Sequence, residues 1–249
     1  MKILVYIRRV PDIDQKIQIS SDGNVDGTDL RYDINPFDAV ALEEALRMRE
    51  KIGPGEVLCV AVGTDELETQ LRTALAMGAD RALLANTDSQ IDHWNSAVLL
   101  QKIVGAECPR IVLVGERMAE DDADMTGPFL AALLDWPQAT FASQITVLGN
   151  DVQVGRETDQ GIETITLPLP TVVTCGLRLN EPRYASFRGQ MKARSMPIER
   201  VFPNDLSNDL QPTVKTLNLK LEGSKRDCVF VDSVDELVHI LQFVAKIHE

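Results

Sequence analysis

The sequence contains few of the side chains from which metal sites and disulfide frameworks are built. Among its 249 residues are four cysteines and three histidines. The histidines are too scattered to indicate a metal cluster: His93, His239 and His248. No two cysteines form a CxxC pair or have metal-ligand spacing: Cys59, Cys108, Cys175 and Cys228. We therefore expect isolated buried thiols in a reducing compartment.

Several motifs that would indicate a function class are also absent. No GxGxxG follows the first apolar segment and no GxxxxGK(S/T) occurs, so the usual dinucleotide fingerprint and the P-loop are missing. The sequence also has neither a GxSxG elbow nor a Cys–His pair, which are arrangements typical of nucleophilic catalysis. The formal net charge of −13 argues against nucleic-acid binding, which needs a positive field against phosphate. The N-terminal apolar run ends at Arg8 and is too short for a signal peptide or a membrane span.

What the chain does have is a regular alternation of strand and helix patterns. Its hydrophobic content of 44% is enough for a sizeable core. Apolar runs predict strands at residues 2–7, 57–62, 81–85 and 111–114. Apolar spacings of three and four predict helices after them, at residues 36–52, 65–78, 92–104 and 126–134. This order predicts an α/β fold in which a parallel sheet carries helices on both faces.

The pattern becomes β-rich after Trp136. Short strands are predicted at residues 144–148, 152–156, 163–167 and 171–177, with a hairpin turn at 149–151. Residues 17–34 predict a hairpin or an irregular excursion. The polar composition of residues 203–227 is typical of a linker. The apolar spacing in residues 233–247 predicts an amphipathic helix, which either folds back or packs on another subunit.

Two helix starts have polar residues suited to capping. Asn35 can cap the first helix, Pro36 fits its first turn, and Asp38 favours the positive end of its dipole. Capping alone is a sufficient structural explanation for this segment. Asp65 and Glu68 form a plausible capping box for the second helix.

The segment from Ile111 to Trp136 is the best candidate for a ligand site. A buried strand ends at Gly115, an acid-rich loop follows, and Thr126, Gly127 and Pro128 begin a helix. In open α/β sheets, ligands bind at the carboxyl ends of strands. The alternative is an ordinary connection with a solvated acidic loop.

Residues 179–198 have no sustained apolar period and carry four basic residues against Glu181 alone. They are either an exposed basic loop or a docking segment for an acidic partner.

Several segments, in the same order, resemble the β subunit of electron transfer flavoproteins. They are VVTCGLRLNEPRYASFRGQMKAR, INPFDAVALEEALRMRE, TALAMGADRA and GPFLAALLDWPQATFASQI. The resemblance implies a Rossmann-like α/β fold of the adenine nucleotide alpha hydrolase type, with a β-rich second part. It implies a nucleotide-binding domain at residues 1–202, which includes a partner-recognition loop at about 175–197. It also implies that residues 203–249 form an arm and helix that pack on the α subunit.

The resemblance further implies that this subunit binds AMP as a structural ligand, while the α subunit holds the redox-active FAD. The implied nucleotide-binding residues are Tyr6, Asn35, Pro36, Phe37, Asp38, Val62, Gly115, Glu116, Arg117, Met118, Ala119, Asp121, Asp122, Ala123, Asp124, Met125 and Thr126. Where AMP-binding relatives commonly have Asn-Gln before Thr-Gly, this chain has Asp124-Met125. In the alternative, electron-bifurcating type, the same pocket holds a second FAD reduced by NADH.

The implied role is that of an electron carrier subunit rather than an enzyme. Docking residues for acyl-CoA or related dehydrogenases would be Arg183, Tyr184, Phe187, Arg188 and Lys192, with Phe187 as the anchor. Glu157 matches a glutamate implicated in flavin-domain motion, and Ile13 and Phe37 would approach the flavin. Electrons would pass on to a quinone oxidoreductase or another acceptor, in the bacterial cytoplasm or the mitochondrial matrix. A nucleotide-hydrolysing protein of the same fold would need phosphate-handling catalytic residues that the sequence does not show.

Overall fold

The computed structural model describes residues 1–20, 25–87, 91–123, 125–202, 210, 213–220 and 230–244. The predicted site residue Asp124 and most of the predicted linker lie outside these residues, as do Cys228 and the end of the predicted C-terminal helix. The chain forms two compact units. The first comprises residues 1–17 and 26–217, and the second comprises residues 18–25 and 218–249.

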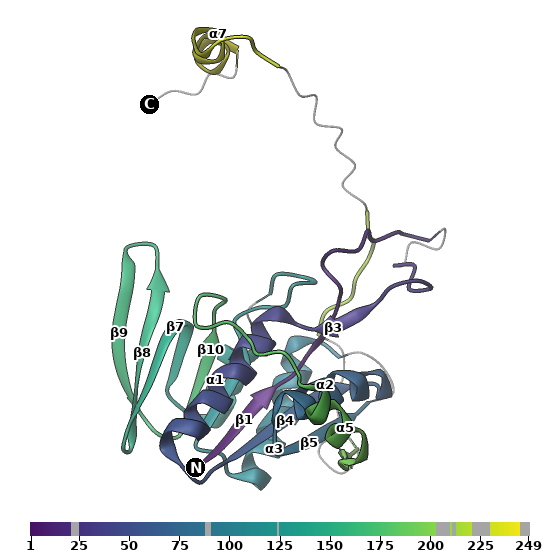
Figure 1. Ribbon diagram of the computed structural model, residues 1–249, viewed down its shortest axis with the longest axis vertical. Helices are drawn as coiled ribbons and strands as arrows, with labels where there is room; N and C mark the ends of the chain where they lie inside the picture. The colour runs from purple at the N-terminus through teal and green to yellow at the C-terminus, as the bar shows by residue number, and fades with distance from the viewer. Residues whose placement is uncertain are drawn as a thin grey trace. The chain divides into compact units, whose positions relative to one another are not determined.

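The first unit is a mixed α/β structure built on one nine-stranded sheet (Figure 1). Its first half alternates strand and helix as predicted: β1 (Lys2–Tyr6), α1 (Pro36–Ile52), β4 (Glu56–Gly63), α2 (Glu68–Met77), β5 (Arg81–Asn86), α3 (His93–Glu107), β6 (Ile111–Gly115) and α4 (Thr126–Leu134). Its second half contains β7 (Gln138–Leu148), β8 (Asp151–Thr158), β9 (Gly161–Pro168), β10 (Thr171–Cys175), α5 (Phe187–Ser195) and β11 (Glu199–Val201).

The sheet has the strand order β11-β5-β4-β1-β6-β10-β7-β8-β9. Pairing is parallel from β11 to β7, and β8 and β9 extend the sheet as an antiparallel meander. The predicted parallel sheet is therefore confirmed. A separate antiparallel pair joins β2 (Arg9–Pro11) to β3 (Tyr32–Ile34), so the predicted excursion is entered and left through a small two-stranded ribbon.

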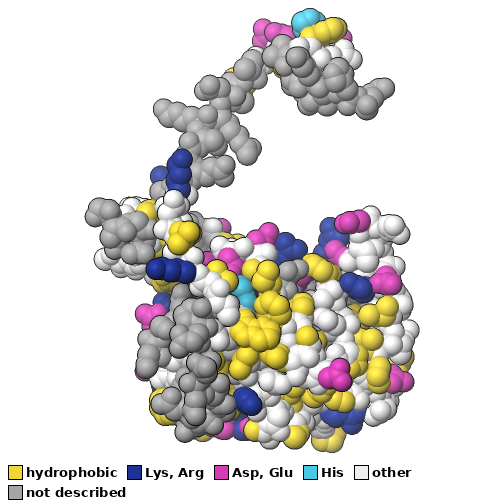
Figure 2. Space-filling view, turned by 180° about the vertical axis from the view of Figure 1, so that it is seen from behind, with side chains coloured by type: hydrophobic (Ala, Val, Ile, Leu, Met, Phe, Trp, Pro, Cys, Tyr) yellow, Lys and Arg dark blue, Asp and Glu magenta, His cyan; other side chains and the backbone are white. Residues whose placement is uncertain are grey.

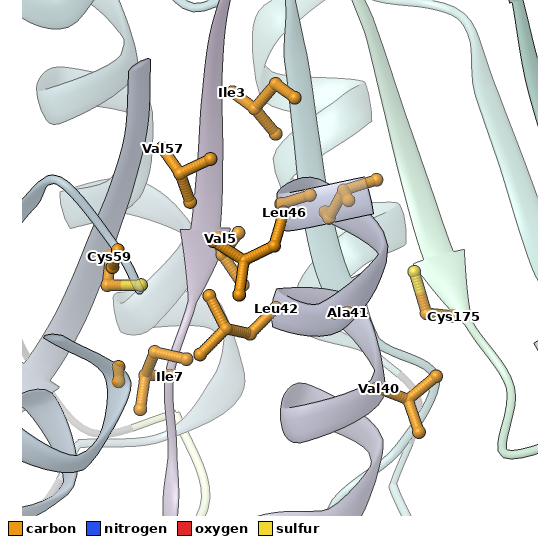
Figure 3. Packing of buried hydrophobic residues seen from close by; sticks show 14 of the residues in the cluster. Ile3, Val5, Ile7, Val40, Ala41, Leu42, Leu46, Val57, Cys59 and Cys175 are labelled. Carbon is orange, nitrogen blue, oxygen red and sulfur yellow. The ribbon is translucent and has the colours of Figure 1, made fainter. Parts of the chain in front are cut away.

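The two faces of β1 explain why its sequence is apolar throughout. Successive side chains of a strand point to opposite faces. Ile3 and Val5 belong to the core cluster that includes Leu42 and Leu46 of α1, whereas Leu4 and Tyr6 belong to the cluster packed under α3 and α4. Figure 3 shows the first cluster, in which Leu42 and Leu46 of α1 point towards Val5 and Ile7. Helices therefore cover both faces, as the alternation of elements predicted.

The layer formed by α3 and α4 carries aromatic side chains. Trp94 packs edge-on against Phe129, with 5.4 Å between ring centroids. Hydrophobic side chains are visible over part of the molecular surface in the view of Figure 2. In the described part of the chain, no helix is both long enough and apolar enough to cross a membrane.

Three local predictions outside the predicted site residues were wrong. The capping box fails because a 3₁₀ turn, Asp65–Leu67, precedes α2, and the Asp65 carboxylate instead accepts a hydrogen bond from Asn86 at 3.1 Å and pairs with Arg200. The first strand after Trp136 begins at Gln138, not Gln144, because a bulge between Ala142 and Gln144 breaks the apolar alternation.

The third wrong prediction concerns Cys108, which was expected to be buried. Cys108 is exposed, and it ends α3 with its backbone in the left-handed conformation. Cys59 and Cys175 are buried as predicted, and burial raises the pKa of both thiols, which makes them unreactive.

The basic segment contains a helix that its apolar pattern did not predict. Helix α5 buries only Ala193, so it shows no amphipathic period. Ser186 caps its start by accepting from Gly189 N at 3.0 Å. Arg72 of α2 satisfies its last turn by donating to the carbonyls of Ala193, at 2.8 Å, and Met196, at 3.0 Å. These contacts fix both ends of the helix.

The second unit contains α7 (Val234–His239), capped by Ser233, and a following π-helical turn (Ile240–Val244). These elements confirm the described part of the predicted C-terminal helix. Most of its described apolar side chains are exposed, including Val234 and Phe243.

A charge network ties together the starts of four strands at the amino edge of the sheet. Arg81 of β5 donates to Glu56 of β4, to Glu199 of β11 and to Glu107 at the end of α3, and Lys2 of β1 donates to Glu107 at 2.7 Å. The hydrogen bonds from Arg81, and to a smaller extent the one from Lys2, lower the pKa of Glu107 to about 2.

Because the folded pKa of Glu107 is depressed, its stabilisation is present above the unfolded pKa of about 4.3 and is lost as pH falls towards 2. Glu107→Gln should therefore lower the free energy of unfolding by about 1–2 kcal/mol at neutral pH and by almost nothing near pH 2. Urea titrations across that range measure the difference. Glu181→Gln, at an exposed carboxylate, is the control; equal pH profiles for the two variants would contradict the prediction.

Candidate functional site

The predicted site lies at the topological switch point of the sheet. From β1 the chain passes to β4 and β5 on one side, and β6 then pairs with the other side of β1. Tyr6, Val62 and Gly115 stand at or next to the carboxyl ends of β1, β4 and β6. Parallel strands end at one edge, so the structure brings these three predicted residues to the same side of the sheet.

A buried ion pair closes this edge. Arg8, which follows β1, donates through Nη2 to Asp38 Oδ1 at 2.6 Å and through Nε to Oδ2 at 2.9 Å. The backbone N–H groups of Arg8 and Gly115 donate to the same carboxylate at 2.8 and 2.9 Å. Arg8 also donates to the carbonyl of Gly115 at 2.8 Å. One carboxylate near the start of α1 thus joins the ends of β1 and β6.

Burial lowers the pKa of Arg8, but the Asp38 carboxylate outweighs it and raises that pKa above the ordinary arginine value. The guanidinium therefore stays charged in the interior. Arg8 is a residue that the sequence prediction missed. The available signal was a cation placed directly after a strand that is apolar throughout.

Gly115 is required by close packing at this junction. A Cβ atom there would lie 2.2 Å from Asp38 Oδ1 and 2.7 Å from the Cβ of Phe37. Phe37 itself is half-buried, while Ile13, the other residue expected near the flavin, is 68% exposed.

Asn35 does not use its side chain as the predicted cap. It occupies the N-cap position of α1, but its Nδ2 donates to the carbonyl of Arg117 at 2.8 Å and its Oδ1 accepts from Ala119 N at 3.1 Å. Asn35 is fully buried. It therefore fixes the loop after β6 against the start of α1.

The acidic loop has internal order. The carbonyl of Met118 accepts from Asp122 N at 2.9 Å, and Met118 N donates to the carbonyl of Ala123 at 3.2 Å. Arg117 pairs with Glu116 at 2.6 Å and with Asp122 at 3.0 Å. Hydrogen bonds from Asp122 and Glu116 raise the pKa of Arg117. This arginine is therefore engaged within the loop.

A histidine that the sequence prediction dismissed lies between the loop and α4. His93 begins α3, directly after its capping residue Asp92. Its Nε2 is 2.8 Å from Asp121 Oδ2, and its Nδ1 is 2.9 Å from Thr126 Oγ1. Thr126 is buried at the start of α4, whereas Met125 is half exposed. The signal available was that His93 opens a helix whose start follows the carboxyl end of β5.

The segment after β10 divides into anchoring and exposed residues. Arg183 donates to Glu43 of α1 at 2.7 Å and to Glu50 at 2.7 Å, although it was predicted to face a partner. These hydrogen bonds raise the pKa of Arg183 and lower that of Glu50. The other predicted docking residues are exposed: Tyr184, Phe187, Arg188 and Lys192.

Glu157 lies near the end of β8. Its neighbour Arg156 pairs with Ala142, which in turn pairs with Cys175 at the carboxyl end of β10. Glu157 pairs with Arg178 at 3.2 Å beside a shallow hollow on the β7–β9 hairpins. Within the described ranges, no group of three or more His, Cys, Asp or Glu side chains is placed to hold a metal ion.

Residues 23–206 match the family model described as "Electron transfer flavoprotein domain". A protein of Arabidopsis thaliana described as "Electron transfer flavoprotein subunit beta, mitochondrial" is 41% identical over 99% of this chain and 100% of its own. Proteins described as "Electron transfer flavoprotein subunit beta" are similar too. That of Bradyrhizobium diazoefficiens is 40% identical over 97% of this chain and 98% of its own, and that of Homo sapiens is 38% identical over 99% of both.

Proposed function

The chain belongs to the family of electron transfer flavoprotein β subunits, and we propose that it serves as the β subunit of an αβ flavoprotein that carries electrons between enzymes. The observation that supports this best is similarity over nearly the whole length of both chains. In this proposal the α subunit holds the redox-active FAD, and residues 203–249 pack on it. The subunit is then a carrier component, in a bacterial cytoplasm or a mitochondrial matrix, rather than an enzyme.

AMP is the ligand we propose for the switch-point edge. Arg8, Asp38 and Asn35 hold the loop after β6 against the start of α1, so three strand ends and two helix starts converge there. Helix α4 begins at Thr126, and backbone N–H groups at a helix start favour a phosphate. Such a site needs no lysine.

Partner docking is assigned to the segment after β10. Phe187 and Tyr184 are exposed aromatic side chains beside basic residues, a composition typical of interface hot spots. The proposed partners are acyl-CoA or related dehydrogenases as donors and a quinone oxidoreductase or similar acceptor. Arg183 serves as the clamp that holds this segment on α1.

Nucleotide content tests the proposal directly. The αβ complex is purified and denatured, and the released nucleotides are separated and quantified. We expect one FAD and one AMP per heterodimer. Two FAD molecules, one of them reducible by NADH, would instead identify an electron-bifurcating flavoprotein and contradict the AMP assignment.

A further inference from the structure

The charge of the acidic loop conflicts with the binding of an anion. Five acidic residues and one arginine lie between Glu116 and Thr126. Arg117 is paired within the loop, and Arg8 is paired with Asp38. A nucleotide phosphate placed at the start of α4 would therefore add negative charge to an edge at which Arg8 and Arg117 are already neutralised.

The chain Asp121–His93–Thr126 offers a way to compensate that charge. A carboxylate only accepts hydrogen bonds, so the hydrogen between Asp121 and His93 belongs to Nε2. In the neutral ring Nδ1 is then an acceptor and receives the hydroxyl hydrogen of Thr126. That hydrogen is not available to a ligand. If Nδ1 gains a proton, it donates to Thr126 Oγ1, and the hydroxyl hydrogen is free to turn towards a phosphate.

We propose that an adenine nucleotide phosphate binds at Thr126 together with one proton, which His93 takes up at Nδ1. This rests on the proposed AMP site and adds to it a recognition residue and a charge-compensation step. The balance is simple: one proton leaves the solvent and bonds to Nδ1, and the imidazolium lies between the Asp121 carboxylate and the Thr126 hydroxyl. The acid loop then supports anion binding, because Asp121 stabilises the positive ring.

The groups around the imidazole are consistent with this assignment. Its own helix contributes Asp92, whose carboxylate is occupied by Asn95 N at 2.9 Å and by Thr213. The loop contributes Asp121, and α4 contributes the uncharged Thr126.

Two further titratable groups stand at the end of β1. Burial raises the pKa of Tyr6, which also hydrogen-bonds Ser96 of α3, so its phenol stays neutral. Arg8 is near enough to Asp121 for their charges to interact, but Asp38 neutralises it.

Calorimetric titration of the full chain with AMP and with adenosine tests the proposal. Binding enthalpies are measured at one near-neutral pH in two buffers of different ionisation enthalpy, which gives the number of protons taken up. We expect about 0.5–1 proton per AMP and none for adenosine. His93→Gln should abolish the uptake and weaken AMP about tenfold while leaving adenosine affinity unchanged. Affinity for AMP should also fall as pH rises in the native chain, but not in His93→Gln.

Two further variants separate recognition from a structural role. His239→Gln, in the C-terminal helix, is the matched control and should behave as the native chain. Asp121→Asn keeps the shape of the side chain and should reduce proton uptake, because the imidazolium loses its carboxylate.

Unchanged proton uptake in His93→Gln would assign the proton to the phosphate itself and overturn the inference while leaving the AMP site intact. Equal weakening of AMP and adenosine would show that His93 only supports the fold of the site, which also overturns it. If neither ligand binds, the AMP assignment fails and the inference fails with it.

Discussion

Asp38→Asn is expected to lower the free energy of unfolding by about 3–5 kcal/mol, the cost of leaving one member of a buried ion pair without its partner. The substitution conserves size, so it creates no cavity. Oδ1 of Asp38 accepts three hydrogen bonds and Oδ2 accepts two, from the Arg8 guanidinium and from the backbone N–H groups of Arg8 and Gly115. In Asp38→Asn, an NH₂ group would replace one of these two oxygens. That group can only donate, so it would be placed against N–H groups that are themselves donors.

Chemical denaturation measures this loss, and an exposed ion pair provides the control. Asp122 pairs with Arg117 at 3.0 Å, but its side chain is largely exposed. Asp122→Asn should therefore cost no more than about 1 kcal/mol. If Asp38→Asn were as mild, Asp38 would not be the group that joins β1, α1 and β6.

Ligand content should respond to the same substitution. Asp38 and Asn35 together hold the start of α1 against the loop after β6. We expect a complex carrying Asp38→Asn, if it assembles, to release less AMP than the native complex. The stability effect and the ligand effect have the same cause, because the residues that close the sheet edge also shape the proposed site.

The parallel half of the fold was predictable because its determinants are local. Every residue of Leu4–Tyr6 is buried, since the sheet is covered on both sides, and a run that is apolar at each position is the signature of such a strand. Helix α1 was predictable from Pro36 at its start and Gly53 at its end. These signals depend on neighbours within a few residues.

The site chemistry was not predictable to the same degree because its partners are distant in sequence. Asn35 was expected to cap its own helix, which is a local role, but its hydrogen bonds go to residues 82 and 84 positions away. His93 was dismissed because the histidines are scattered, yet its partners Asp121 and Thr126 are also distant in sequence. Helix α5 was not predicted because polar contacts of Arg72 and Ser186 fix its two ends. Such contacts do not produce a helical spacing of apolar residues in the sequence.

Phe187→Ala is expected to lower the kcat/KM for electron transfer from a partner dehydrogenase about 30-fold or more, which corresponds to the loss of at least about 2 kcal/mol at a hot spot. The side chain is 77% exposed and stands at the first position of α5. Truncating it should leave the unfolding free energy and the FAD content of the complex unchanged. Stopped-flow reduction of the flavin by the dehydrogenase measures the effect.

The magnitude depends on how rigidly the segment is held, and the structure gives three anchors. Arg183 is bound to Glu43, and Asn180 donates to the carbonyl of Val40 at 3.1 Å. At Gly189, α5 approaches α2 so closely that a Cβ atom would lie 2.3 Å from the carbonyl oxygen of Ala76. A preorganised aromatic side chain loses little entropy on binding, so more of its contact energy becomes affinity.

Leu148→Ala is the matched control, because Leu148 is an apolar residue of β7 that is 50% exposed and lies outside the docking segment. It should leave electron transfer unchanged. If the two variants transfer electrons equally well, Phe187 is not the anchor. If Phe187→Ala slows transfer only at high ionic strength, the energy of docking resides in the charges of Arg188 and Lys192, whose effect salt screens. A large loss of electron-transfer rate at every salt concentration would show that the docking energy comes from the aromatic side chain of Phe187.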